Sequence, residues 1–161
     1  MEADWTKKVQ IWGKDRKIAL KKFNEILGQW KLRMPPVKPL VLDFGLSEFY
    51  KTGLIESWIA NEDRGGYCGK FLFVFPGQTC PFHHHNFKHE TFFVVKGSVF
   101  MKVGNKKRGM KEGDVLKMKQ GTGHSFTGQG KNGALLLEAS KPCKPRDSIF
   151  EDKRIGKNGI I

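Results

Sequence analysis

Apolar residues follow a helical period in the first part of the chain and a strand-like period after about residue 37. Before that point they recur at steps of three and four residues, at Ala19, Phe23, Ile26, Leu27 and Trp30. This spacing is typical of one face of an amphipathic helix. We therefore predict largely helical structure over residues 1–33, with Asp15 as a candidate N-cap. Pro35 and Pro36 should end it, because proline disfavours helix in the residue before it.

Lysines at positions 17, 21 and 22 lie on the other side of this predicted helix. The apolar face is therefore expected to pack on the outside of the rest of the fold. A partner surface in a dimer is the alternative use of the same face.

From Pro39 onward, short β-rich runs alternate with turns that contain glycine. The runs cover Leu40–Phe44, Leu54–Ala60, Tyr67–Phe75, Glu90–Val95, Ser98–Val103, Val115–Met118, His124–Thr127 and Ala134–Ala139. Hairpin-type turns are expected at residues 62–66 and 104–107. Regular short spacing of this kind predicts an all-β sandwich or barrel. We expect a helical extension at 1–36, one barrel at 37–141 and a tail at 142–161 that packs on the barrel.

Composition limits the possible partners. The 161 residues are 39% hydrophobic with thirteen Phe, which indicates one globular domain. A net charge of +13 comes from 29 basic and 16 acidic residues, but the basic residues are scattered and no nucleic-acid motif accompanies them. We predict no nucleic-acid partner; the charge serves solubility or attracts small anions. No apolar run is long enough for a membrane span or a signal peptide.

The cysteines at 68, 80 and 143 are odd in number and form no CxxC pair. We interpret each as a small buried hydrophobe in a reducing compartment, and predict a cytoplasmic location.

One stretch brings together side chains of the type that bind metals. His83 and His85 are one residue apart, so in a strand they share a face, and Glu90 follows across a tight turn. His124 ends a second stretch with a glycine-rich turn, and completes a set of three imidazoles and one carboxylate. Such a set suits Mn, Fe, Co, Ni or Zn and leaves coordination positions open. His84 and His89 have the opposite parity, and we expect them outside the ligand set.

Two further residues are candidates for proton transfer. Glu138 lies in an otherwise apolar run, where burial of a carboxylate is costly unless the site uses it. The alternative for Glu138 is an outward position at the rim. Lys88 precedes Glu90 by two residues and shares its face if the strand begins that early. Phe92 and Phe126 share the parity of Glu90 and His124, and either form the floor of a pocket or belong to the core.

The spacing of these residues resembles that of a known superfamily. Gly77, His83, His85, Glu90 and Gly97 match every fixed position of the first cupin motif. Residues 113–124 resemble the second motif, with Lys119 and Gly128 in place of its usual Pro and Asn. The stretches 42–46, 67–70, 75–81 and 88–92 resemble the D-lyxose isomerase family within that superfamily, and the likeness covers roughly residues 40–154. The fold implied is a single cupin (jelly-roll) barrel.

The resemblance also implies a function. It implies Mn²⁺ held by His83, His85, Glu90 and His124, and interconversion of D-lyxose with D-xylulose and of D-mannose with D-fructose through an enediolate. It implies Glu138 as general base and Lys88 as acid, base or hydroxyl-orienting group, with Asp147 and Arg154 of the tail contacting sugar hydroxyls. A homodimer is expected. A cupin dioxygenase with non-haem iron and a non-catalytic sugar-binding cupin are the alternatives.

Overall fold

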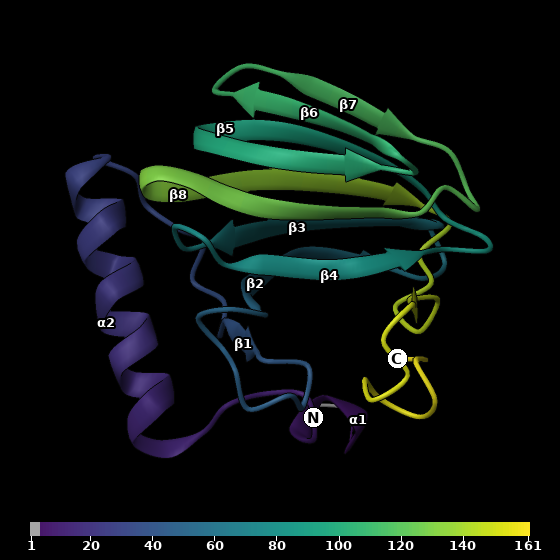
Figure 1. Ribbon diagram of the computed structural model, residues 1–161, viewed down its shortest axis with the longest axis horizontal. Helices are drawn as coiled ribbons and strands as arrows, with labels where there is room; N and C mark the ends of the chain where they lie inside the picture. The colour runs from purple at the N-terminus through teal and green to yellow at the C-terminus, as the bar shows by residue number, and fades with distance from the viewer. Residues whose placement is uncertain (1–3) are drawn as a thin grey trace.

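Two long strands organise the fold of the computed structural model, which describes residues 4–161 (Figure 1). They are β5 (His89–Val103) and β8 (His124–Lys141), and they pair with each other antiparallel along their length. The sequence pattern predicted each of them as two separate strands. In both strands the two predicted halves join at a glycine, Gly97 in β5 and Gly133 in β8. The two backbones are so close there that a Cβ on Gly97 would lie 2.1 Å from the Gly133 carbonyl oxygen. Both glycines have positive φ, so the strands bend there without being interrupted.

The other strands extend this pair into one curled nine-stranded sheet. One path through it runs β1-β2-β3-β8-β4-β9, while β5 also pairs with β6 and β7. The bounds of these strands are β1 Leu40–Leu42, β2 Leu54–Glu62, β3 Tyr67–Val74, β4 Thr79–His84, β6 Lys106–Lys111, β7 Val115–Met118 and β9 Ile149–Phe150. The predicted all-β cupin barrel with an N-terminal helical extension is confirmed.

The N-terminal region contains a short helix, α1 (Asp4–Lys7), and a long one, α2 (Gly13–Gln29). Between them Gln10 bridges to Leu42 of β1, so the helix predicted over residues 1–33 is interrupted. The prediction of Asp15 as N-cap is wrong: Trp12 occupies that position, and Asp15 lies in the first turn. Asp15 still places a negative charge near the positive end of the helix dipole.

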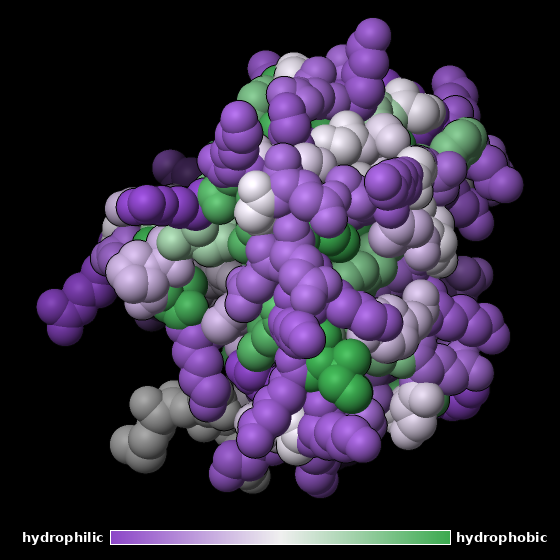
Figure 2. Space-filling view, turned by 90° about the vertical axis from the view of Figure 1, so that its left-hand side faces the viewer, coloured by the Kyte–Doolittle hydropathy of each residue, from purple (hydrophilic) through white to green (hydrophobic). Residues whose placement is uncertain are grey.

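The apolar stripe of α2 packs on the outer face of the sheet, as predicted. Ala19, Phe23 and Leu27 are buried, and the Phe23 ring lies 4.8 Å from that of Phe73 on β3. The opposite side of the helix carries exposed lysines. Figure 2, which views the molecule from the α2 side, shows a mostly hydrophilic face with small hydrophobic areas between the charged side chains.

The tail after residue 141 lies below the curled sheet in Figure 1, on the same side of it as β1 and α1. Its strand β9 pairs with β4, and Phe150 and Ile155 are buried. Cys143 forms a disulfide with Cys68 of β3, which corrects the prediction of three unpaired thiols. Those two cysteines are separated by 75 positions in sequence, and only the fold brings them together. Cys80 is free and buried, as predicted.

Inside the barrel, apolar side chains from both halves of the sheet form one core, which includes Leu72, Phe92, Met101 and Phe126. A group of buried polar residues interrupts this core at the end nearest the tail. Within residues 4–161, no helix has the length and hydropathy needed to cross a bilayer.

Candidate active site

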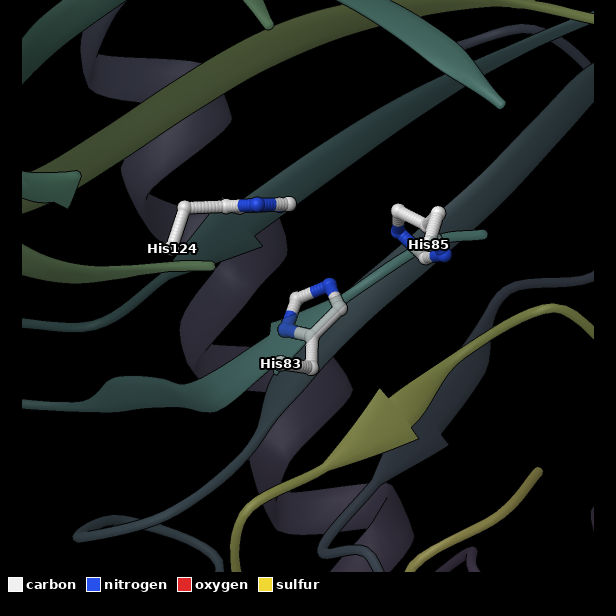
Figure 3. A group of neighbouring side chains, drawn as sticks. All are labelled: His83, His85 and His124. Atoms are coloured by element: carbon white, nitrogen blue, oxygen red, sulfur yellow. The ribbon is translucent and has the colours of Figure 1, made fainter. Parts of the chain in front are cut away.

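Three histidines converge inside the barrel near the tail (Figure 3). His83 belongs to β4, His85 directly follows it, and His124 is the first residue of β8. One nitrogen from each lies within 4.8 Å of the others, and all three residues are buried. The alternation of side chains in a strand places His83 and His85 on the same face. Antiparallel pairing of His83 with His124 adds the third ring.

Backbone carbonyls determine which nitrogen of each ring is available. The Nδ1 atoms of His83, His85 and His124 lie 2.7, 2.7 and 3.0 Å from the carbonyl oxygens of Pro81, Asp147 and Thr122. A carbonyl oxygen can only accept, so each Nδ1 carries the proton and donates it. Each Nε2 is then left with a lone pair, which is the arrangement that metal-binding histidines adopt.

The Glu90 carboxylate lies beside two of these lone pairs. Its Oε1 is 3.0 Å from Nε2 of His85, and its Oε2 is 3.3 Å from Nε2 of His124. Neither Oε2 of Glu90 nor Nε2 of His124 has a hydrogen-bond partner among the described residues, although both are buried. Acceptor atoms gathered in this way repel one another unless a cation lies among them. The four side chains therefore fit a divalent metal ion.

Burial adjusts the protonation of this group. It lowers the pKa of His83 well below its usual value, with further lowering by His124 and His85, and it also lowers the pKa of His85. Burial opposes the charge on Glu90, whereas the ammonium of Lys88, 3.5 Å from its Oε1, favours the ionised form. Neutral imidazoles and an ionised carboxylate are the forms that bind metals.

Lys88 and Asp147 meet at the turn between β4 and β5. Lys88 is buried, and its Nζ lies 3.5 Å from Oε1 of Glu90. The carboxylate of Asp147 accepts hydrogen bonds from the backbone N–H groups of Asn86, Phe87 and Lys88, at 2.9–3.1 Å. Asp147 thus holds the turn that presents both His85 and Lys88, and its carboxylate is occupied by backbone donors.

Glu138 points into the barrel from β8. The residue is 3% exposed, and its Oε1 has no hydrogen-bond partner among the described residues. Burial raises the pKa of Glu138 to about 7, against the opposing charge of Lys70. A carboxyl group in this state can accept or release a proton near neutral pH. The alternative of an outward rim position is therefore wrong.

Two further charged residues line this region, and the sequence reasoning missed them both. Lys70 of β3 lies 3.4 Å from Oε2 of Glu56 on β2 and 3.4 Å from Oε2 of Glu138. The signal was present in the sequence: Lys70 shares the inward parity of Leu72 and Val74, and Glu56 that of Leu54. As for Glu138, burying the charge of Lys70 or Glu56 among apolar residues is costly, which marks both as candidate functional residues.

Several residues of the site line a cavity of about 50 Å³, although Lys88, Glu90 and His124 are not among its walls. Its walls include Glu56, Lys70, His83, His85, Phe92, Phe126, Glu138, Ser148 and Phe150. Phe92 and Phe126 are both core residues and cavity walls, so the two interpretations of them hold together. Phe150 of the tail stacks on His83, with ring centroids 5.0 Å apart. The volume suffices for an ion and a few waters.

The remaining candidates lie away from this cavity. Arg154 is exposed, and its guanidinium forms a bidentate pair with Asp152. His84 is half-buried on the other face of β4, and His89 is exposed. Neither belongs to the histidine cluster.

Comparison with known proteins places this arrangement in a family. The cupin domain family matches residues 71–139. The D-lyxose/D-mannose isomerase of Thermosediminibacter oceani is 33% identical in an alignment of 142 positions that covers 71% of this chain and 77% of the relative. The D-lyxose ketol-isomerase of Cohnella laeviribosi is 30% identical in an alignment of 148 positions that covers 75% of this chain and 80% of the relative.

A solved structure extends the likeness of fold to nearly the whole chain. The L-ribose isomerase of Cellulomonas parahominis, in a structure with L-ribose, aligns with a TM-score of 0.72 over 94% of this chain and 97% of that one, at 14% identity. At this identity the likeness concerns the fold alone. Taken with the sequence relatives, the histidine cluster and the barrel around it identify the chain as a member of the D-lyxose isomerase family of cupin proteins.

Proposed function

We propose that this protein is a metal-dependent aldose–ketose isomerase that interconverts D-lyxose with D-xylulose and D-mannose with D-fructose. Its relatives' names supply the substrate class. The observation that supports the proposal most directly is the group of buried acceptor atoms on His83, His85, His124 and Glu90, beside the buried acid Glu138. We propose Mn²⁺ as the ion, with Co²⁺, Fe²⁺, Ni²⁺ and Zn²⁺ as alternatives.

The four ligands each have a defined task. The three Nδ1–H groups are held by carbonyls, so the imidazoles present Nε2 without having to reorient. Glu90 contributes the negative charge, and its Oε1 is also next to the Lys88 ammonium. A divalent ion bound there would polarise the sugar carbonyl and the neighbouring hydroxyl.

Proton transfer falls to Glu138 and Lys88. Isomerisation moves one proton from the hydroxyl-bearing carbon to the carbonyl carbon next to it, and a second proton from the hydroxyl oxygen to the former carbonyl oxygen. The base for the first transfer needs a pKa near the working pH. Glu138 meets this condition, and its Oε1 is free to accept the proton. Lys88 carries protons that can be donated to a sugar oxygen, and it is fixed next to Glu90. Phe92 and Phe126 supply an apolar floor for the carbon skeleton.

Sugar binding requires the cavity to enlarge, because ligand pockets usually exceed about 300 Å³ and this cavity measures about 50 Å³. Ser148 and Phe150 are the walls contributed by the tail. We propose that movement of this segment admits the substrate. Contacts of Asp147 and Arg154 with sugar hydroxyls remain predictions.

The test is direct. Purified protein with Mn²⁺ should convert D-fructose to D-mannose and D-xylulose to D-lyxose. Glu138→Gln should abolish conversion, with a loss of at least about 100-fold, while the protein still binds Mn²⁺. Full activity of Glu138→Gln would refute the mechanism.

The alternatives give different results. Oxygen uptake with iron and no sugar conversion would indicate a dioxygenase, and sugar binding without conversion would indicate a binding protein. The homodimer and the cytoplasmic location also remain proposals, and the Cys68–Cys143 disulfide removes the argument from unpaired cysteines for the second. Light scattering of the purified protein tests the first, and fractionation of cells tests the second.

A further inference from the structure

Lys70 lies at the centre of a buried chain of charged and polar groups that the proposed proton transfer does not use. Its Nζ is 3.4 Å from Glu56 and 3.4 Å from Glu138, and the side chains of these three residues are only 12%, 9% and 4% exposed. The three belong to neighbouring strands, and Lys70 is directly opposite Glu138 in the β3–β8 pairing. All three line the cavity whose walls also include His83 and His85.

A second set of contacts, with Glu56 and Trp58 of β2, holds Lys70 on the side away from Glu138 in the strand order. The indole Nε1–H of Trp58 donates to Oε1 of Glu56, whose Oε2 accepts from Lys70. The Lys70 ammonium also lies 4.9 Å from the centre of the Trp58 ring. Both oxygens of Glu56 are thereby occupied, and the lysine is fixed between two carboxylates and an aromatic ring.

Glu138 is held differently from Glu56. Its Oε2 contacts Lys70, whereas its Oε1 has no hydrogen-bond partner among the described residues. One oxygen is therefore fixed and the other is available. A base in this position keeps a single orientation toward a bound molecule, and orientation contributes strongly to the rate of proton transfer.

Lys70 offsets part of the negative charge around Glu138. The titratable groups around Glu138 are Glu56 (β2), Lys70 (β3), Cys80, His83 and His85 (β4 and its end), and Lys88 and Glu90 (just before and in β5). Burial raises the pKa of the Cys80 thiol, so Cys80 is neutral. Burial opposes the charge on Lys70, but Glu138 and Glu56 together outweigh it and raise its pKa, so Lys70 stays cationic.

We propose that Lys70 is a positioning residue for the general base: it holds Oε2 of Glu138 so that Oε1 faces the reacting carbons, and Glu56 with Trp58 holds Lys70 in turn. This inference rests on the proposed function. Lys70 itself neither gives nor takes a proton. The proton leaves the hydroxyl-bearing carbon of the sugar for Oε1 of Glu138 and returns from Oε1 to the former carbonyl carbon. The hydroxyl proton passes to the former carbonyl oxygen, where Lys88 is the proposed donor and acceptor, so the enzyme ends each turnover unchanged.

Three substitutions test this in the Mn²⁺-loaded enzyme. Lys70→Met should lower kcat by about 100-fold while KM changes by less than about threefold, and the Mn²⁺ content should remain that of the wild type. Lys70→Arg keeps the cation and should retain more than about a tenth of kcat. Glu56→Gln keeps the hydrogen-bonding shape and removes one negative charge.

A second measurement does not depend on turnover. The Glu138 carboxyl can be titrated by ¹³C NMR in the metal-free protein and assigned by its loss in Glu138→Gln. Its pKa should rise by about one unit or more in Lys70→Met and fall in Glu56→Gln, because the two variants remove opposite charges. A purely structural role would not produce shifts of opposite sign.

The outcomes separate the two proposals. A wild-type enzyme without sugar conversion refutes the proposed function, while the opposite NMR shifts would still support the Lys70–Glu138 contact. An active wild type combined with an unshifted Glu138 titration and unchanged kcat in Lys70→Met overturns the role of Lys70. If Lys70→Met does not fold, the titration of Glu138 in Glu56→Gln tests the inference instead. A pKa of Glu138 that is unchanged or raised in that variant rejects it.

Discussion

Nε2 of His124 and Oε2 of Glu90 lie 3.3 Å apart in the interior of the barrel, and neither has a hydrogen-bond partner among residues 4–161. Two buried acceptors this close are unfavourable without a cation. Glu90 lies near the start of β5 and His124 at the start of β8, and in the pairing of these strands Glu90 is opposite Ser140 while His124 is opposite Val103. The two residues therefore meet across the interior because the sheet curls on itself, not because they are neighbours in the ladder.

Metal binding should therefore raise thermal stability. Mn²⁺ at about 100 times its Kd adds about 2.7 kcal/mol to the free energy of unfolding, which for a chain of this size is about 5–10 °C in Tm. A chelator should reverse the shift. His124→Ala should lose it, whereas His84→Ala, on the other face of β4, should keep it. An equal Mn²⁺-induced rise in Tm for His124→Ala would contradict the assigned ligand set.

The rate should depend on the ionisation of Glu138. Burial raises its pKa to about 7, and the base must be ionised to accept a proton, so kcat should rise with pH and level off above that value. A bound divalent cation moves this limb toward lower pH, because it favours the carboxylate. Rates measured with saturating Mn²⁺ between about pH 5 and 9 check this, and a kcat that falls with pH across the range would rule out Glu138 as base.

Asp147 should be important for the turn rather than for the barrel as a whole. Its carboxylate accepts three backbone N–H groups and its carbonyl accepts from His85. Asp147→Ala leaves the three N–H groups without partners, at a cost of about 2–4 kcal/mol. The backbone carbonyl remains, but the loosened turn should hold His85 less firmly and weaken Mn²⁺ binding about 10- to 100-fold. Calorimetry and metal titration measure the two effects. Asp152→Ala is the control, since Asp152 pairs with exposed Arg154, and a similar loss there would contradict the assignment.

The disulfide should contribute to stability because it closes a long loop. For a sequence separation of 75 residues, the loss of chain entropy in the unfolded state corresponds to about 4 kcal/mol. Reduction, or the double substitution Cys68→Ser and Cys143→Ser, should lower Tm by about 10 °C. Cys80→Ser, at the remaining free cysteine, should leave the response to reductant intact. A Tm that does not respond to reductant would show that these cysteines are unpaired in solution.

Much of the site was predictable because its members obey local rules. Alternation within a strand put His83 and His85 on one face, and an apolar run containing one carboxylate identified Glu138 as unusual. The three-and-four spacing of Ala19, Phe23 and Leu27 likewise identified the buried side of α2. These patterns reflect periodicities of the backbone, which are local and do not depend on the rest of the chain.

What the sequence by itself determined is the set of side chains that face inward on each strand, since this follows from the two-residue period of the backbone. Which inward residues become neighbours depends on strand order and register. The contact of Lys70 with Glu56 and Glu138, the pairing of Cys68 with Cys143, and the support of His85 by Asp147 each join distant segments. Only the tertiary structure decided these three contacts, because a contact between distant segments depends on how the whole sheet closes. Such a contact produces no periodic pattern in the sequence.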